Sequence, residues 1–207
     1  MVSDINFLLV GNSRLHWAKY SKNQSKFFHT KKEQKVPENI DPDKLIWASV
    51  GKLPNFSLKG ENEIKTKDIH LSNLPNYFGV DRALACLAAL KTIENPLKKD
   101  LIIADFGTIL SITKLNSNGS ILGGQLIPGF LTQLKSMEKY TKNLKVPKKF
   151  EIPSKDFLTN TEEAILKGVI NSLTGVIENS FNPLKDILLT CGGDSEFLTK
   201  SLKTQKE

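Results

Sequence analysis

The chain has 207 residues, of which 39% are hydrophobic and 25% are charged, and these are the proportions of a globular protein. Its formal net charge is +7. A positive field of this kind attracts anionic small molecules such as nucleotides, and we do not expect nucleic acid as a partner. No apolar stretch approaches the roughly 20 residues that a membrane-spanning helix needs, so no membrane partner is expected.

The cysteine content and the N-terminal sequence favour a cytoplasmic protein. Cys86 and Cys191 are the two cysteines and lie far apart in the chain, which is typical of reduced thiols. The apolar run near the N-terminus follows no basic region, so it does not resemble a signal peptide. We therefore expect a reduced protein in the cytoplasm.

The N-terminal part of the chain predicts a sheet followed by a helix. Asn6–Val10 is an apolar strand, Gly11-Asn12-Ser13 turns it, and Arg14–Tyr20 returns. Further strands are expected at Ser25–His29 and Leu45–Val50, with an edge strand at Asp68–Leu71. From Asp81 the apolar residues follow a helical spacing, which predicts a helix that ends before Pro96.

The segment Leu101–Phe130 predicts three consecutive antiparallel strands. The strand Leu101–Ala104 is followed by a turn that carries Asp105, Gly107 and Thr108, and Ile109–Ile112 returns. Asn118-Gly119 is a hairpin turn before the strand Ser120–Ile127, which Pro128-Gly129 ends. These residues suit a phosphate-binding module, and they also suit an ordinary β-meander.

Two parts of the chain share one pattern. LLVGNSRLHW and IADFGTILSI both run from a strand through a glycine and a small polar pair into a second strand. Such a repeat predicts a duplicated domain.

The C-terminal part predicts helices and one strand. Phe130–Lys142 is expected as a helix, and the lysine-rich span to Pro153 as an exposed loop. Asn160–Ser180 is the clearest helix, with Asn160 as its cap and Glu163 in a capping box. A last strand, Asp186–Thr190, precedes Gly192-Gly193-Asp194 and a short helix.

Four segments, in order along most of the chain, resemble the type III pantothenate kinases, a branch of the actin/hexokinase/Hsp70-like phosphotransferase superfamily. Gly11-Asn12-Ser13 resembles the first phosphate motif, D-x-G-N-T. The other matches are Gly79-Val80-Asp81-Arg82 with G-x-D-R, Asp105–Thr108 through Gly123-Gly124 and Pro128-Gly129 with D-x-G-T…GG…PG, and Asn160–Gly168 with N-T-x-x-A-I…G.

The resemblance implies an α/β fold of two duplicated ribonuclease-H-like domains, residues 1–95 and 96–207, with the active site in the cleft between them. It implies transfer of the γ-phosphoryl group of ATP to pantothenate, which gives 4′-phosphopantothenate in the first step of coenzyme A biosynthesis. A homodimer is also implied.

The resemblance assigns each matching residue a role. Backbone groups at glycine turns can bind phosphate without a side chain in the way. The expected ATP-binding residues are Val10, Gly11, Asn12, Ser13, Arg14 and Thr108. The expected substrate-binding residues are Gly79, Val80, Asp81, Arg82 and Thr161, with Asp81 as catalytic base and Thr161 closing the pantothenate pocket across the dimer interface.

Metal ions are expected as cofactors. Asp105 corresponds to the aspartate with which the family binds a monovalent cation, potassium or ammonium, and Mg²⁺ is expected with ATP. Purely structural roles also suit the matching residues: Asp81 as an N-terminal helix carboxylate, Arg82 as a surface residue, Thr161 as part of a helix cap, and the two turns as simple hairpins.

The chain departs from the family pattern at several positions. Leu9 stands where the first motif has an aspartate, Thr113 stands where an aspartate is common, and Ile109 replaces a small residue. Two other functions therefore stay open: an impaired homologue that acts as a transcription accessory factor, and a kinase for another small alcohol. The histidines show no metal-ligand spacing and receive no role: His16, His29 and His70.

Overall fold

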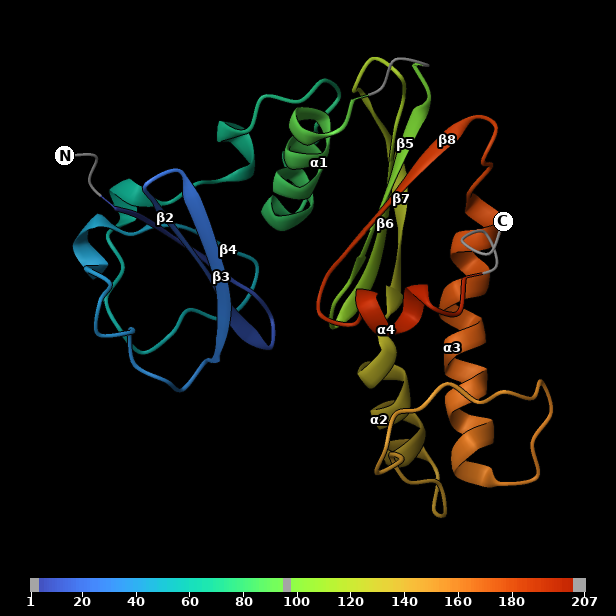
Figure 1. The fold of residues 1–207 in the computed structure, drawn as a ribbon. Helices are drawn as coiled ribbons and strands as arrows, with labels where there is room; N and C mark the ends of the chain where they lie inside the picture. Colours follow the sequence, from blue (N-terminus) through green and yellow to red (C-terminus); the bar gives the residue numbers. More distant parts are fainter. Residues whose placement is uncertain (1–3, 95–97, 203–207) are drawn as a thin grey trace. The chain divides into compact units, whose positions relative to one another are not determined.

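The computed structural model describes residues 4–94 and 98–202. The chain divides into two compact units, Met1–Ala88 and Ala89–Glu207, and the division falls inside helix α1, Val80–Thr92. The expected boundary between residues 95 and 96 lies outside the described residues. Each unit is described by itself below (Figure 1).

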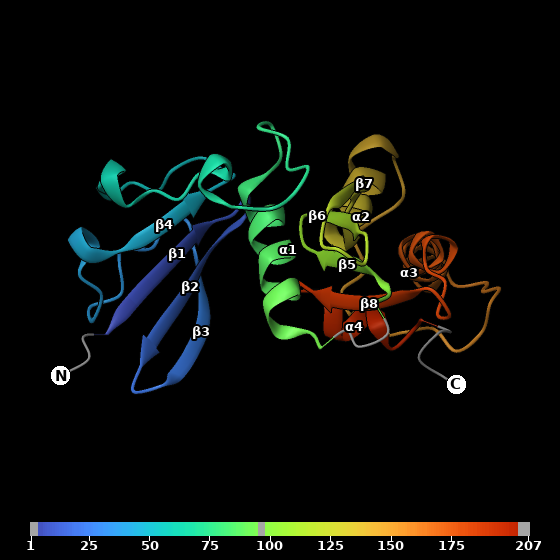
Figure 2. The same cartoon turned by 90° about the horizontal axis from the view of Figure 1, so that it is seen from above.

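The first unit contains a four-stranded mixed sheet. Its strands are β1 (Ile5–Val10), β2 (Arg14–Ser21), β3 (Gln24–Lys31) and β4 (Ile46–Ser49), in the order β3-β2-β1-β4. The first three form an antiparallel meander, and β4 joins β1 in parallel (Figure 2). One face of this sheet buries its alternate apolar side chains in a core: Leu8, Val10, Leu15, Trp17 and Trp47.

The second unit repeats this arrangement. Its strands are β5 (Asp100–Phe106), β6 (Ile109–Leu115), β7 (Ile121–Pro128) and β8 (Asp186–Cys191), in the order β7-β6-β5-β8. Again three strands form an antiparallel meander and the fourth pairs with the first in parallel. The duplicated α/β fold of two ribonuclease-H-like halves is thus confirmed.

The helices of the second unit cover one face of its sheet. They are α2 (Phe130–Tyr140), α3 (Thr161–Ser180) and α4 (Ser195–Thr199). Their apolar side chains meet those of β5 and β6 in one core that includes Ile102, Phe106, Leu134, Val169, Leu173 and Leu198. Within the described part of the chain, no helix is long and apolar enough to cross a membrane.

One expected strand is wrong. A short 3₁₀ helix, η1 (Pro42–Lys44), lies before β4. Two more, η2 (Gly60–Asn62) and η3 (Thr66–Asp68), lie in the connection from β4 to α1. Asp68 therefore ends a 3₁₀ turn and does not begin the edge strand predicted at Asp68–Leu71. The physical reason is local, since the Asp68 carboxylate accepts from the backbone N–H of Lys65 at 2.8 Å and so closes the turn.

The turn predicted at Asn118-Gly119 is present, and one side chain organises it. The Asn116 Oδ1 atom accepts from the backbone N–H groups of Asn118 and Ser120, at 3.0 and 2.9 Å. Gly119 has a φ of +80°, which glycine adopts without strain. The connection between β6 and β7 is therefore longer than a two-residue hairpin loop.

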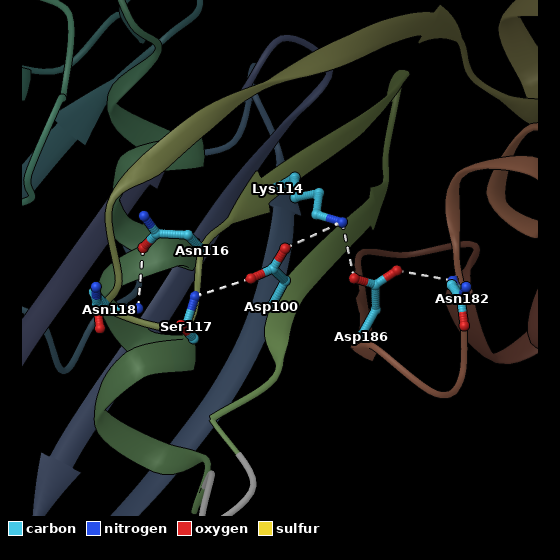
Figure 3. A network of polar contacts seen from close by, with 7 residues as sticks. All are labelled: Asp100, Lys114, Asn116, Ser117, Asn118, Asn182 and Asp186. Carbon is cyan, nitrogen blue, oxygen red and sulfur yellow. Dashed lines mark hydrogen bonds and ion pairs between the residues drawn. The ribbon is translucent and has the colours of Figure 1, made fainter.

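A network of ion pairs ties together the strands at this end of the second sheet (Figure 3). The Lys114 ammonium on β6 lies 2.8 Å from Asp186 on β8 and 3.3 Å from Asp100 on β5. Asp186 also accepts from the backbone N–H of Asn182 at 2.8 Å, and its side chain is only 2% exposed. The hydrogen bond to Asp186 raises the pKa of Lys114, so this contact favours the charged amine.

Lys114→Met tests this network. Removing the ammonium leaves the buried Asp186 carboxylate without its cation, and we expect a loss of about 1–3 kcal/mol in the free energy of unfolding. Because the pKa of Lys114 is raised, this stability is present at neutral pH and is lost only as the pH rises above the range of ordinary lysines. Urea unfolding measures the loss, with the exposed Lys135→Met as control. Equal losses in both variants would contradict the prediction.

The two thiols should differ in reactivity. Cys86 is buried on α1, and burial raises the pKa of its thiol to about 11. Because the thiolate is the reactive form, Cys86 should resist iodoacetamide at neutral pH until the protein unfolds, whereas the exposed Cys191 should be modified in the native state. Peptide mass mapping before and after denaturation measures this, and rapid native labelling of Cys86 would show the prediction to be wrong.

Candidate functional site

The first glycine turn joins β1 to β2 and is held at its base. The Gly11 N–H donates to the carbonyl of Arg14 at 3.0 Å. The carbonyl of Val10 accepts from the N–H groups of Val50 and Gly51, at 3.0 and 3.2 Å, in the segment after β4. Asn12 and Ser13, at the tip of the turn, are exposed.

Close packing explains the glycines at position 11, in the turn, and at position 51, in the segment that packs against it. A Cβ atom at Gly51 would overlap the Gly11 carbonyl oxygen, and it would lie 2.8 Å from the Lys32 Nζ atom. A Cβ atom at Gly11 would lie 3.0 Å from the Arg14 carbonyl oxygen and 3.1 Å from the His16 Nε2 atom. The turn therefore has room for backbone alone at both positions.

The second glycine turn joins β5 to β6 and is held in a similar way. The carbonyl of Phe106, just before Gly107, accepts from the Asp194 N–H in the segment after β8, at 3.1 Å. The carbonyl of Thr108 accepts from the Gly129 N–H at 2.9 Å and from the Thr132 hydroxyl at 2.6 Å. The start of α2 thus fixes this turn, which carries the predicted ATP-binding residue Thr108.

Asp105 is a half-buried residue of β5 between the buried Ala104 and Phe106, and it pairs in register with Ser111 on β6 and Cys191 on β8. Gly192 has a φ of +92°, and a Cβ atom there would overlap the Asp105 Oδ1 atom and lie 2.6 Å from the Phe106 backbone nitrogen. The half-buried Asp105 carboxylate is an oxygen ligand of the type that hard cations prefer, and it is the predicted cation ligand of this unit.

The described residues offer no larger ligand set for a metal ion. Among residues 4–94 and 98–202, no group of three or more histidine, cysteine, aspartate or glutamate side chains could hold one. Mg²⁺ is often bound through one or two carboxylates together with substrate phosphates and water. Binding of this kind needs no preformed cluster of protein ligands.

Asp81 lies in the first turn of α1. The helix begins with the hydrogen bond from the Ala83 N–H to the Gly79 carbonyl, at 3.0 Å, and the Asp81 Oδ1 atom accepts from the Arg82 N–H at 2.7 Å. A Cβ atom at Gly79 would lie 2.7 Å from that carboxylate oxygen, so glycine leaves it room. The carboxylate therefore lies at the positive end of the helix dipole.

Arg82 lies against an aromatic ring. Its guanidinium carbon lies 4.0 Å from the centre of the Phe78 ring. Burial lowers the pKa of Arg82, and the nearby Cys86 and Asp81 act against this shift. The arginine is therefore partly withdrawn from water beside the predicted base, which strengthens any contact that it makes with an anion.

A pocket of about 380 Å³ in the first unit adjoins the G-x-D-R motif. Gly79 and Val80 line it together with Ser49 and Val50 at the end of β4. Val50 also donates to the Val10 carbonyl at the first glycine turn, so one short segment contacts both the turn and the pocket. The structure thus brings two of the predicted motifs together within one unit.

The sequence did not reveal the pocket's polar residues, which are Ser49, Glu63, Lys65 and Thr66. Glu63 forms an ion pair with Lys65 at 3.1 Å, and the Thr66 hydroxyl donates to the Phe78 carbonyl at 2.6 Å. One signal could have indicated Ser49: it ends a parallel strand, and ligands of α/β folds bind beyond the carboxyl ends of such strands.

Thr161 is the first residue of α3 and is exposed. The predicted helix cap is confirmed, since the Asn160 side chain accepts from the Glu163 N–H at 3.1 Å. Thr161 lies on a different element from the turn that carries Asp105 and Thr108. Its contact with a second subunit stays a prediction.

The sequence was compared with known families and proteins. A family model described as type III pantothenate kinase matches residues 59–182. A type III pantothenate kinase of Thermosynechococcus vestitus is 29% identical and aligns over 95% of this chain and 80% of its own length. One from Flavobacterium psychrophilum is 31% identical and aligns over 94% of this chain and 88% of its own length.

Solved structures agree on the fold. A Campylobacter jejuni protein assigned to a Baf family of transcriptional activators superposes with a TM-score of 0.66, at 20% sequence identity, over 96% of this chain and 88% of that one. This likeness concerns the fold alone. Because the family model covers more than half of the sequence and the 31% identical relative covers nearly all of it, the chain belongs to the type III pantothenate kinase family.

Proposed function

We propose that this protein transfers the γ-phosphoryl group of ATP to the primary hydroxyl of pantothenate, which gives 4′-phosphopantothenate in the first step of coenzyme A biosynthesis. The main support within the structure is the segment Ser49–Gly51. Val50 and Gly51 donate hydrogen bonds to the first glycine turn, and Ser49 and Val50 line the pocket together with Gly79 and Val80, the residues that precede Asp81. A phosphate-binding turn and an acceptor pocket that both contact the segment after β4 would lie close together, as phosphoryl transfer requires.

The two glycine turns would bind the phosphates of ATP. Phosphoryl transfer has a loose transition state, so catalysis depends mainly on alignment and on the spreading of charge. Gly11 and Gly107 leave their turns open to phosphate oxygens, and Arg14 and Thr108 add a cation and a hydroxyl. Mg²⁺ held by the phosphates would neutralise the charge that develops on the transferred group.

Asp81 would act as the catalytic base. As the bond between the pantothenate hydroxyl oxygen and the γ-phosphorus forms, the bond from that phosphorus to ADP breaks, and the hydroxyl proton passes to the Asp81 carboxylate. The pocket of about 380 Å³ has the volume of a small-molecule site, and Arg82 would bind the pantothenate carboxylate.

A monovalent cation, potassium or ammonium, would bind at Asp105, and a homodimer would bring Thr161 to the partner's pantothenate pocket. Two other functions are distinguished by experiment. The likeness in fold to a Baf family protein and the net charge of +7 would suit a regulator that turns over no ATP. A kinase for another small alcohol would turn over ATP and leave pantothenate unchanged.

The deciding experiment incubates the purified protein with ATP, Mg²⁺, K⁺ and pantothenate and follows 4′-phosphopantothenate by mass spectrometry. We expect one equivalent of phosphopantothenate for each ADP formed. ADP formation without phosphopantothenate would indicate another acceptor, and a lack of both products would contradict the kinase assignment.

Asp81→Asn tests the base. The amide keeps the size and the helix position of the side chain but cannot accept the proton, so we expect kcat to fall about 10²- to 10⁴-fold, with little change in thermal stability. The matched control is Asp43→Asn, which changes an exposed carboxylate in the same unit. Near-normal turnover of Asp81→Asn would remove Asp81 from this role.

Exchange of potassium for sodium tests the cation site. We expect the wild-type rate to fall in sodium, because sodium is smaller than potassium and would need shorter distances to the oxygen donors at Asp105. We expect Asp105→Asn to lose most of this difference. Rates measured at constant ionic strength provide the comparison, and Asp156→Asn serves as the control in the same unit. A wild-type rate that is the same in both salts would count against a potassium site.

A further inference from the structure

Four basic side chains form a block on one face of the first sheet, next to the first glycine turn. The ladder between β2 and β3 pairs Arg14 with Lys31 and His16 with His29. Because side chains alternate along a strand, these four share one face, while Leu15 of the same ladder points into the core on the other face. The Arg14 Nη1 atom donates a hydrogen bond to the His29 Nε2 atom at 3.3 Å, so the two strands bring these side chains into contact.

The block borders the turn itself. The His16 Nε2 atom lies 3.1 Å from the point that a Cβ atom at Gly11 would occupy, which places the imidazole over the glycine. On a neighbouring side, the Lys32 Nζ atom lies 2.8 Å from the corresponding point at Gly51 and donates to the carbonyl of Lys52 at 3.0 Å. Cationic groups thus flank both glycines that shape the turn.

Carboxylates of the described residues do not compensate this charge. Within residues 4–94 and 98–202, the ion pairs include none of the five basic residues just described. The β1 residue directly opposite His16 is Leu9. Arg14 and Lys31 are like charges directly opposite one another on the ladder, which destabilises a sheet, and a bound anion would offset this cost.

We propose that this basic cluster, defined as Arg14, His16, His29, Lys31 and Lys32, binds the polyphosphate tail of the nucleotide, with His16 and His29 as positioning residues for the phosphates. The inference rests on the proposed function, which assigns only Arg14 and the turn backbone to ATP. A compact polyanion suits the site better than nucleic acid does, because the charges gather around one turn and do not form a stripe along the surface.

The cluster should couple nucleotide binding to proton uptake. Burial lowers the pKa of His16, and the charges of His29 and Arg14 lower it further, so the free protein favours the neutral imidazole. Its partner on β1 is Leu9, and Gly11 of the turn lies beside its ring; neither carries a charged side chain. From β3 it faces His29, with Lys31 as the next residue on that face. A bound phosphate would favour the imidazolium, so binding should be tighter at low pH and should weaken as the pH rises through the pKa of the bound state.

The test measures binding to the full chain, independently of turnover. MgATP and inorganic tripolyphosphate are each titrated by calorimetry at several values between about pH 5 and pH 8, the range in which histidine titrates. We expect His16→Gln and His29→Gln to weaken the binding of both probes about tenfold at the low end of this pH range, and we expect His16→Gln to flatten the pH dependence of the affinity. Lys31→Gln should weaken binding without changing how the affinity depends on pH. His70→Gln, at an exposed position away from the cluster, should change neither the affinity nor its pH dependence.

Circular dichroism of each variant verifies that it is folded, and a folded variant with wild-type affinity and slope would overturn the proposal. If the wild type makes phosphopantothenate while the histidine variants keep its ATP KM at every pH, the proposal is wrong and the proposed function stands. If the histidines contribute to MgATP binding but no phosphopantothenate is formed, the role of the cluster is supported and the assignment of pantothenate as the phosphoryl acceptor is wrong. Tighter binding of a DNA duplex at the same histidines would overturn the assignment to a nucleotide.

Discussion

The structure depends on one backbone contact, made once in each unit. The carbonyl that precedes the turn glycine accepts a hydrogen bond from the segment that follows the parallel strand: Val10 from Val50 and Gly51, and Phe106 from Asp194. Backbone groups at the end of a sheet need partners, and here they find them in one another. Each turn is therefore held at its base while its tip stays exposed.

The same contact explains why glycines accompany both turns. Gly51 and Gly192 occupy equivalent places after β4 and β8, and each lies so close to the turn of its own unit that a side chain would overlap it. The two units have kept this backbone geometry and differ in their side chains. The first carries a basic cluster and Leu9, and the second carries the carboxylate of Asp105.

Periodicity and turn residues were sufficient to predict most of the strands and the main helices, because these depend on neighbours in the sequence. The duplication was predicted because the same strand–glycine–strand pattern occurs twice in the chain. The short 3₁₀ helix at Thr66–Asp68 was not predicted, since it forms through a single carboxylate-to-backbone bond within an otherwise irregular segment. The pocket residues Ser49, Glu63 and Thr66 and the pair His16 and His29 were missed for another reason. Their proximity results from pairing between separate strands and loops, which no local pattern records.

The charge beside the first turn has a consequence for the end of a catalytic cycle. On the proposed assignment, the cluster is neutralised by the number of negative charges on the nucleotide tail. ADP is one phosphate shorter than ATP and would make fewer contacts with Arg14, His16 and His29. ADP would then dissociate more readily than ATP, so that the same cluster that holds the substrate nucleotide favours release of the product.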